Sequence, residues 1–214
     1  MRLVLTSDWH GSLPEDLPEG DVLLMAGDIF PVRDHSAQAQ EEFARVELAD
    51  YLESLSYSEI IIVAGNHDFM CYDFPTTWFW NLPKNVTYLQ DAPRIVDGVK
   101  IWGSPWSPKF GGWAFMRTDD ELEGIYGDIF KPEDIDIMVS HGPPYMACDR
   151  NIEGESCGSL ALRDWILVNQ PKLVVTGHIH EAYGSTRIKD TDVFNVSRMN
   201  RHYEPVNKAV TYEI

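Results

Sequence analysis

The feature that most restricts the fold of this 214-residue chain is a set of five short apolar runs, each followed by side chains able to bind a metal. Each run is rich in Val, Ile and Leu and lacks apolar–polar alternation, which is typical of strands buried on both faces of a sheet. In open α/β sheets, ligands bind outside the carboxyl ends of the strands. We therefore expect one site at these ends. The runs lie in "RLVLTSDWH", "DVLLMAGD", "EIIIVAGNHD", "IDIMVSHGPP" and "KLVVTGHIH".

The side chains after these runs form a coherent set of metal donors. A single histidine at a strand end most often has no chemical role, but five of the seven histidines of the chain lie here. Imidazole, carboxylate and amide groups without a thiolate suit Mn²⁺, Fe²⁺, Zn²⁺ or Ni²⁺. Eight groups are more than one tetrahedral ion requires, so we expect two divalent metal ions. The set is Asp8, His10, Asp28, Asn66, His67, His141, His178 and His180.

Two metal ions held close together favour hydrolytic phosphoester chemistry. A pair roughly 3.5–4 Å apart can clamp a phosphoryl oxygen, lower the pKa of a bridging water and neutralise developing charge. The net charge of the chain is −17, and no basic stripe offsets it. Because such a field repels polyanions, we expect a small phosphoester substrate and no long nucleic acid.

Length and composition indicate one globular domain over residues 1–214, because no Pro/Gly/Ser-rich linker or change in composition divides the chain. The chain starts directly with an apparent strand and contains no apolar run of membrane-spanning length. Three cysteines form no C-x-x-C pair, which favours reduced thiols. We therefore expect a cytoplasmic protein without a membrane partner.

The order of the elements predicts an α/β fold. Helical spacing of apolar residues within 37–55, after the second run, indicates a crossover helix, and further helices are expected at 119–130 and 159–169. From Asn85 onward, "NVTYLQD", "PRIVDGVKIWGSPW", "STRIKDTDVFNVS" and "NKAVTYEI" indicate hairpins and a second sheet. The expected architecture is a four-layer α/β/β/α sandwich around a central pair of mixed β-sheets.

The blocks "DWH", "GD", "GNHD", "SHGPP" and "GHIH" occur in the order D-x-H, G-D, G-N-H-D, H and G-H-x-H. This order resembles the signature of the calcineurin-like metallophosphoesterases. The segments "GSPWSPKFGGWAF" and "YEPVNKAV" extend the likeness, which is to the small metallophosphoesterase-domain-containing proteins. The resemblance implies the metallophosphoesterase fold and phosphoric ester hydrolysis by a metal-bridging hydroxide.

The same resemblance implies a role for each predicted ligand. Asp28 would bridge the two ions. His67 would not bind metal and would stabilise or protonate the leaving oxygen, which suits a side chain that exchanges protons near neutral pH. One ion would be held by Asp8, His10, Asp28 and His180, and the other by Asp28, Asn66, His141 and His178.

Other polar and aromatic residues are weaker candidates. Arg33 and Arg150 could contact a phosphate through a bidentate fork, although solvation is the common role of surface arginines. For Asp68 we expect a structural role, either orienting a neighbour or capping the next turn. The remaining histidines, His35 and His202, are interpreted as surface residues. A base-stacking role is less expected than a core position for the aromatic residues Trp102, Trp106, Trp113 and Phe115.

The sequence therefore predicts a phosphodiesterase for small diesters such as cyclic nucleotides, on the strength of the subgroup resemblance. Three alternatives stay open. One is a non-catalytic interaction module on the same fold, against which the intact ligand blocks argue. The others are a nuclease, which would usually need a basic channel, and a protein phosphatase.

Overall fold

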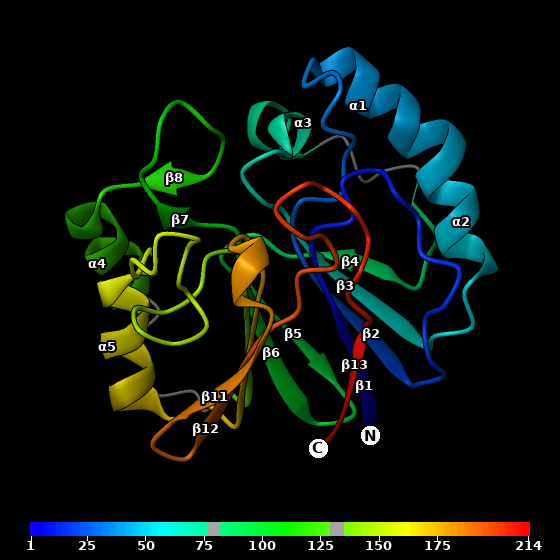
Figure 1. Ribbon diagram of the computed structural model, residues 1–214. Coiled ribbons are helices and arrows are strands. Elements are labelled where there is room, and N and C mark those ends of the chain that lie inside the picture. Colours follow the sequence, from blue (N-terminus) through cyan, green and yellow to red (C-terminus); the bar gives the residue numbers. More distant parts are fainter. Residues whose placement is uncertain (77–81, 129–134) are drawn as a thin grey trace.

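A computed structural model describes residues 1–76, 82–128 and 135–214 of the chain. Two mixed β-sheets lie face to face, and helices cover their outer sides (Figure 1). In the first sheet β1, β2, β3 and β4 run parallel, and β13 pairs antiparallel with β1. The strand order of this sheet is β13 (Val210–Glu213), β1 (Arg2–Thr6), β2 (Val22–Ala26), β3 (Glu59–Val63) and β4 (Val86–Tyr88).

The second sheet has a parallel centre with an antiparallel hairpin at each edge. One hairpin turns at Asp97 and Gly98 and the other at Lys189 and Asp190, which confirms the predicted hairpins and second sheet. A separate short ribbon pairs β7 (Ser107–Pro108) with β8 (Met116–Arg117). The strand order is β11 (Gly184–Ile188), β12 (Thr191–Asn195), β10 (Leu173–Thr176), β9 (Ile137–Ser140), β6 (Val99–Ser104) and β5 (Ala92–Val96).

Two of the segments that were predicted to form the hairpins and the second sheet belong to the first sheet instead. "NVTYLQD" supplies β4, which extends the sheet beyond β3, and "NKAVTYEI" supplies β13 beside β1. Without them, β1 and β3 would each present a row of unpaired backbone groups along an edge of the sheet. Hydrogen bonding at these two edges, rather than position along the chain, decides where both strands lie.

The predicted helices are present. The first is a continuous helical run that comprises α1 (Ala37–Phe43), a π-helical turn (Ala44–Leu48) and α2 (Ala49–Ser54). Short α3 (Phe69–Asp73) follows β3. The later helices are α4 (Asp119–Asp128) and α5 (Leu160–Asn169), and the last two residues of the predicted 119–130 helix lie outside the described residues.

Two of the helical segments, the run that begins with α1 and helix α5, each start after a serine that caps them. The Ser36 hydroxyl accepts a hydrogen bond from the Ala39 N–H, and the Ser159 hydroxyl accepts one from the Leu162 N–H. Such caps satisfy backbone donors that the first turn leaves unpaired. Across the described ranges, no helix combines the length and the apolar character needed to cross a bilayer.

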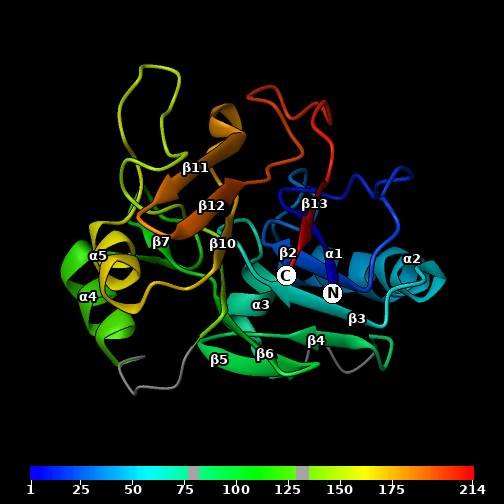
Figure 2. The same cartoon turned by 90° about the horizontal axis from the view of Figure 1, so that it is seen from below.

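The hydrophobic interior has two parts, because side chains alternate across each strand. Leu3 and Leu5 of β1 pack between the sheets, whereas Val4 points to the helices on the outer side. Figure 2 shows the resulting layers, with α4 and α5 on one side and α2 on the other. The predicted four-layer α/β/β/α arrangement is therefore confirmed.

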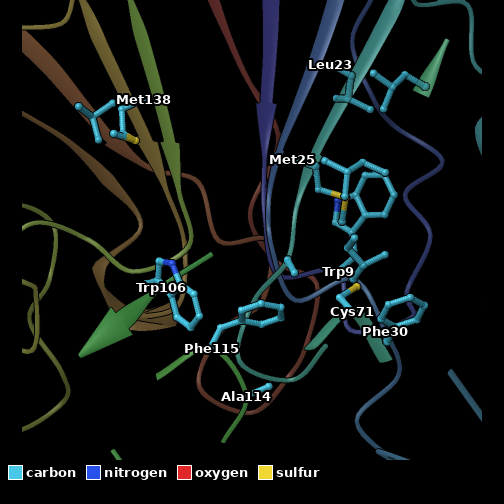
Figure 3. Packing of buried hydrophobic residues seen from close by; sticks show 14 of the residues in the cluster. Trp9, Leu23, Met25, Phe30, Cys71, Trp106, Ala114, Phe115 and Met138 are labelled. Carbon is cyan, nitrogen blue, oxygen red and sulfur yellow. The ribbon is translucent and has the colours of Figure 1, made fainter. Parts of the chain in front are cut away.

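The aromatic segment after β6 lies mainly in the core, as predicted. Figure 3 shows Trp106 and Phe115 among buried residues of the same hydrophobic cluster as Met25 of β2 and Trp9, which follows β1. Phe110 is exposed, and the ring of Trp113 is only half-buried and lies beside a histidine. This position places Trp113 in the candidate site.

Candidate metal centre

The predicted ligands meet where the carboxyl ends of two sheets come together. Strands β1, β2 and β3 of the first sheet end beside strands β9 and β10 of the second (Figure 1). The first sheet contributes Asp8, His10, Asp28, Asn66 and His67, and the second contributes His141, His178 and His180. The site is thus at the seam between the sheets rather than above a single sheet.

The backbone at the site adopts conformations that few residues tolerate. Asp8, His10, Asp28 and His178 all have positive φ values, between 47° and 69°. Such conformations cost on the order of 1–3 kcal/mol each and persist where the surroundings enforce them. At Gly177, a side chain would collide with the Asp8 carboxylate, so only glycine allows this approach.

The first group of donors consists of Asp8, His10 and His180, whose ligand atoms lie within 4.8 Å of one another. The Nε2 atom of His180 lies 3.3 Å from Asp8 Oδ1 and 3.2 Å from His10 Nε2. These three residues belong to the set predicted for one ion, and Asp28 Oδ2 lies 3.7 Å from His10 Nε2. The structure therefore brings all four members of that set together.

The second group consists of Asp8, Asp28 and His141. The Nε2 atom of His141 lies 3.4 Å from Asp28 Oδ2 and 2.9 Å from Asn66 Oδ1. Asp28 Oδ2 thus lies near a histidine from each predicted set, as a bridging carboxylate would. Asp8 also belongs to both groups, which the sequence did not predict.

His178 approaches the centre in two ways. Its ring centroid lies 4.9 Å from that of His141, and its backbone N–H donates to both oxygens of Asp8, at 3.2 and 3.1 Å. The side chain therefore lies next to the second group, while its backbone fixes the orientation of a carboxylate in the first.

Backbone carbonyls orient two of the histidine rings. His141 Nδ1 lies 2.8 Å from the Ala26 oxygen, and His180 Nδ1 lies 3.0 Å from the Asn200 oxygen. A carbonyl oxygen only accepts, so each Nδ1 atom carries a proton and each Nε2 atom faces the cluster. This is the tautomer in which a neutral imidazole offers its Nε2 lone pair to a metal.

Divalent ions fit this arrangement of donors. The inward Nε2 atoms of His10 and His180 are only 3.2 Å apart, and the carboxylates of Asp8 and Asp28 flank them. Lone pairs at this separation repel each other unless a proton or a cation lies between them. Nitrogen and carboxylate donors without thiolate match the metals expected from the sequence.

Charges inside the cluster shift the pKa values of its members in opposite directions. Burial opposes ionisation of Asp8, but its hydrogen bond to His180 and the charge of that residue lower its pKa to about 2. Burial lowers the pKa of His10 to about 4 and that of His178 to about 3. For His141, burial is outweighed by the charges of Asp28 and Asp8 together with its hydrogen bonds, and the pKa rises to about 9.

These pKa shifts predict that metal binding releases protons. At neutral pH, His10 and His178 are already neutral, whereas His141 holds a proton that a metal ligand must lose. The apparent metal affinity should therefore rise with pH until it passes about 9, the pKa of His141. Calorimetric titration with Zn²⁺ in buffers of different ionisation enthalpy should show net proton release at neutral pH. Loading without proton release would contradict this assignment.

His67 lies beside the donor groups without joining either of them. Its backbone N–H donates to Asp28 Oδ1 at 2.8 Å, and its carbonyl accepts from the Gln40 side chain at 2.7 Å. The ring centroid lies 4.9 Å from that of His10 and 4.4 Å from that of Trp113. This position is consistent with the predicted non-ligand role.

The interpretation of His35 as a partnerless surface histidine was wrong. Its ring is half-buried, and its Nε2 atom lies 2.8 Å from His67 Nδ1. No motif marks His35, so the sequence offered no signal for this contact. His202 is exposed, as predicted.

Asp68 has a structural role, as expected, but it does not cap the next helix. Its Oδ1 atom accepts from the N–H groups of Ile29 and Phe30, and its Oδ2 atom accepts from that of Gly65. The side chain therefore ties the loop after β2 to the loop after β3. Burial and the charge of Asp28 raise its pKa to about 7.

A cavity of about 870 Å³ opens beside the cluster, with Asp28, Asn66, His67, His178 and His180 in its wall. Lys109 and Arg201 are its cationic lining residues among the described ranges, and Trp113 and Tyr203 add aromatic rings. Tyr203 packs 4.9 Å from the ring of His10 and 5.1 Å from that of His180. None of these four was predicted as a site residue, because loops that no spacing pattern describes carry them to the site.

The two arginines proposed from the sequence as phosphate contacts lie elsewhere. Arg33 and Arg150 are exposed and are not among the described residues that line the cavity. The Arg150 guanidinium donates to the Gly154 carbonyl at 3.4 Å, within its own loop.

Comparisons with known proteins identify the family and the fold of the chain. The chain is 32% identical to the human metallophosphoesterase domain-containing protein 1 over 239 aligned residues, which cover all of this chain and 71% of the human protein. One solved structure, 15% identical, matches with a TM-score of 0.65 and covers 99% of this chain and 98% of its own. The phosphopantetheinyl hydrolase of Mycobacterium tuberculosis, 16% identical, matches with a TM-score of 0.57 and coverages of 97% and 95%. Residues 1–182 match the calcineurin-like phosphoesterase family, and the chain belongs to that family.

Proposed function

We propose that the protein is a dinuclear metal-dependent phosphodiesterase that hydrolyses small phosphodiesters such as cyclic nucleotides. The observation that carries the proposal is the convergence of carboxylate, imidazole and amide donors from five strand ends beside a cavity, whose wall includes Asp28, Asn66 and two of the histidines. Similarity to the human metallophosphoesterase domain-containing protein supports the same reaction class. Among the metals that suit these donors, we propose Mn²⁺ first.

Each part of the cavity wall has a role in this reaction. Bound divalent ions supply Lewis-acid activation of a phosphoryl oxygen and of water. Lys109 and Arg201 place positive charge near an anionic substrate, within a chain whose net charge is −17. His67 lines the cavity, where its ring could give a proton to a leaving oxygen.

The size and lining of the cavity support a small diester with a flat substituent. Its volume of about 870 Å³ is in the range of small-molecule sites, roughly 300–1,000 Å³. The half-buried ring of Trp113 and the exposed ring of Tyr203 offer faces on which a nucleobase could stack. We propose that the substrate is a small phosphoester rather than long nucleic acid, and that the enzyme acts in the cytoplasm, where its free cysteines Cys71, Cys148 and Cys157 would stay reduced.

A panel of phosphate esters tests the proposal. We expect Mn²⁺-dependent hydrolysis of bis-para-nitrophenyl phosphate and of 2′,3′- or 3′,5′-cyclic nucleotides, with slower hydrolysis of para-nitrophenyl phosphate and loss of activity with a chelator. Absence of turnover with Mn²⁺, Fe²⁺, Zn²⁺ and Ni²⁺ would favour a non-catalytic interaction module. A preference for long DNA would favour a nuclease, and a preference for phosphoprotein would favour a protein phosphatase.

A further inference from the structure

We infer that His35 is a positioning residue that fixes the tautomer and the orientation of the His67 ring. The inference rests on the proposed function, in which His67 provides a proton to the leaving oxygen. His35 Nε2 lies 2.8 Å from His67 Nδ1, which is hydrogen-bonding distance for two ring nitrogens. The contact joins the loop before α1 to the loop after β3, 32 residues apart in the sequence.

The surroundings hold both rings in place. The His35 ring centroid lies 5.6 Å from that of Phe69 and 5.4 Å from that of Trp113. The Trp113 ring also packs against His67, at 4.4 Å. These contacts keep the two imidazoles facing each other, so the bond between them has a defined geometry.

The backbone of His67 is fixed independently of His35. Its N–H donates to Asp28 and its carbonyl accepts from the buried side chain of Gln40, which also accepts from the Met70 N–H through Oε1. These bonds leave open the rotation of the imidazole and the choice of the nitrogen that carries the proton. His35 is the described residue that contacts the ring through a hydrogen bond, and it therefore determines both.

The direction of the hydrogen bond follows from the chemistry required. In the state that acts as an acid, the His67 Nδ1–H donates to the Nε2 lone pair of His35, so the proton that His67 can give up is the one on its Nε2 atom. As the P–O bond breaks, the leaving oxygen takes the Nε2 proton, and His67 becomes neutral with its proton on Nδ1. An orienting partner acts in this way in other catalytic imidazoles, where the wrong tautomer abolishes most of the activity.

If His35 only packed against its neighbours, the activity would depend on a ring at position 35 and not on a hydrogen-bond acceptor there. The ring of His35 contacts Phe69 and Trp113, so packing alone would be retained by another ring. A hydrogen-bond acceptor without a ring would retain only the contact with His67. Two variants therefore separate the two roles: His35→Phe keeps a ring and removes the acceptor, whereas His35→Gln keeps an acceptor and removes the ring.

The kinetic test compares these variants on a cyclic nucleotide, whose alkoxide leaving group needs a proton. We expect His35→Phe to lower kcat roughly 10–100-fold, the usual effect of losing a partner that orients a reactive side chain. KM and bound metal should be unchanged, and His35→Gln should recover most of the activity. Glu53→Gln, which changes an exposed side chain on α2, is the control and should have no effect. Wild-type kcat in His35→Phe, or a loss in His35→Gln alone, would overturn the inference.

Nuclear magnetic resonance provides a readout that does not depend on turnover. In protein labelled with ¹⁵N-histidine, long-range ¹H–¹⁵N correlations report which ring nitrogen carries the proton. Above the titration range of histidine, His67 should carry it on Nδ1 in wild type and in His35→Gln, in both metal-free and Zn²⁺-loaded protein. In His35→Phe, the proton should move partly or wholly to Nε2. An unchanged tautomer in His35→Phe would refute the inference, whereas an inactive wild type with the expected tautomers would refute only the proposed function.

Discussion

Replacement of Asp28 by asparagine should prevent the site from holding two metal ions. The Asp28 Oδ2 atom lies 3.7 Å from His10 Nε2 and 3.4 Å from His141 Nε2, so the loss of its charge affects both predicted ligand sets. Asparagine is nearly isosteric and keeps an Oδ1 atom that can accept the His67 N–H. We expect activity on every ester to fall by at least roughly 10²–10³-fold, as for the loss of a main electrostatic stabiliser.

Metal analysis decides the outcome for Asp28→Asn. Inductively coupled plasma analysis should find fewer than two ions per chain, while circular dichroism should show an unchanged fold. Asp190→Asn, in the exposed turn between β11 and β12, is the matched control and should bind metal like the wild type. His180→Asn, which removes a terminal ligand, should have a smaller effect than Asp28→Asn. Two fully occupied ions in Asp28→Asn would contradict the bridging assignment.

Replacement of His67 by alanine should separate proton transfer from metal binding. His67 belongs to neither donor group, so His67→Ala should keep its metal and its fold. For esters with poor leaving groups, we expect kcat to fall about 10²–10⁴-fold, the range of a general acid. Nitrophenyl esters should lose less, because their leaving groups need little protonation.

The difference between the two classes of ester is the diagnostic quantity for His67→Ala. An equal loss on both classes would show that His67 stabilises charge on the phosphoryl group instead of delivering a proton. Loss of a metal ion from the variant would show that His67 is a ligand. Glu53→Ala, at an exposed position on α2, should reproduce wild-type rates on both classes and serves as the control.

The donor cluster was predictable from the sequence because its residues follow buried strands directly. A parallel strand has a characteristic apolar run, and its carboxyl end lies at a known edge of the sheet. Asp8, Asp28 and His141 each come within a few residues of such a run. The positions of these residues in the chain are therefore enough to bring them together.

The other residues of the site were not predictable, because they lie on loops that individual hydrogen bonds hold in position. His35 reaches the site through its contact with His67, and the loop that carries Arg201 and Tyr203 is joined to it through the Asn200 carbonyl and His180. No periodicity encodes such contacts. For the same reason, the sequence could not distinguish Arg33 and Arg150, which are exposed, from the basic residues that line the cavity as contacts for a phosphate.

The position of the donors at the seam between the two sheets has a mechanical consequence. Asp28 extends from one sheet and His141 from the other, so any ion that both hold acts as a cross-link between the two halves of the sandwich. The unfolded chain has no such arrangement, and binding to the folded form alone adds stability in proportion to the logarithm of ion concentration. With such an ion bound, the two sheets could not slide past each other without releasing it, so metal occupancy would report on the alignment of the sheets.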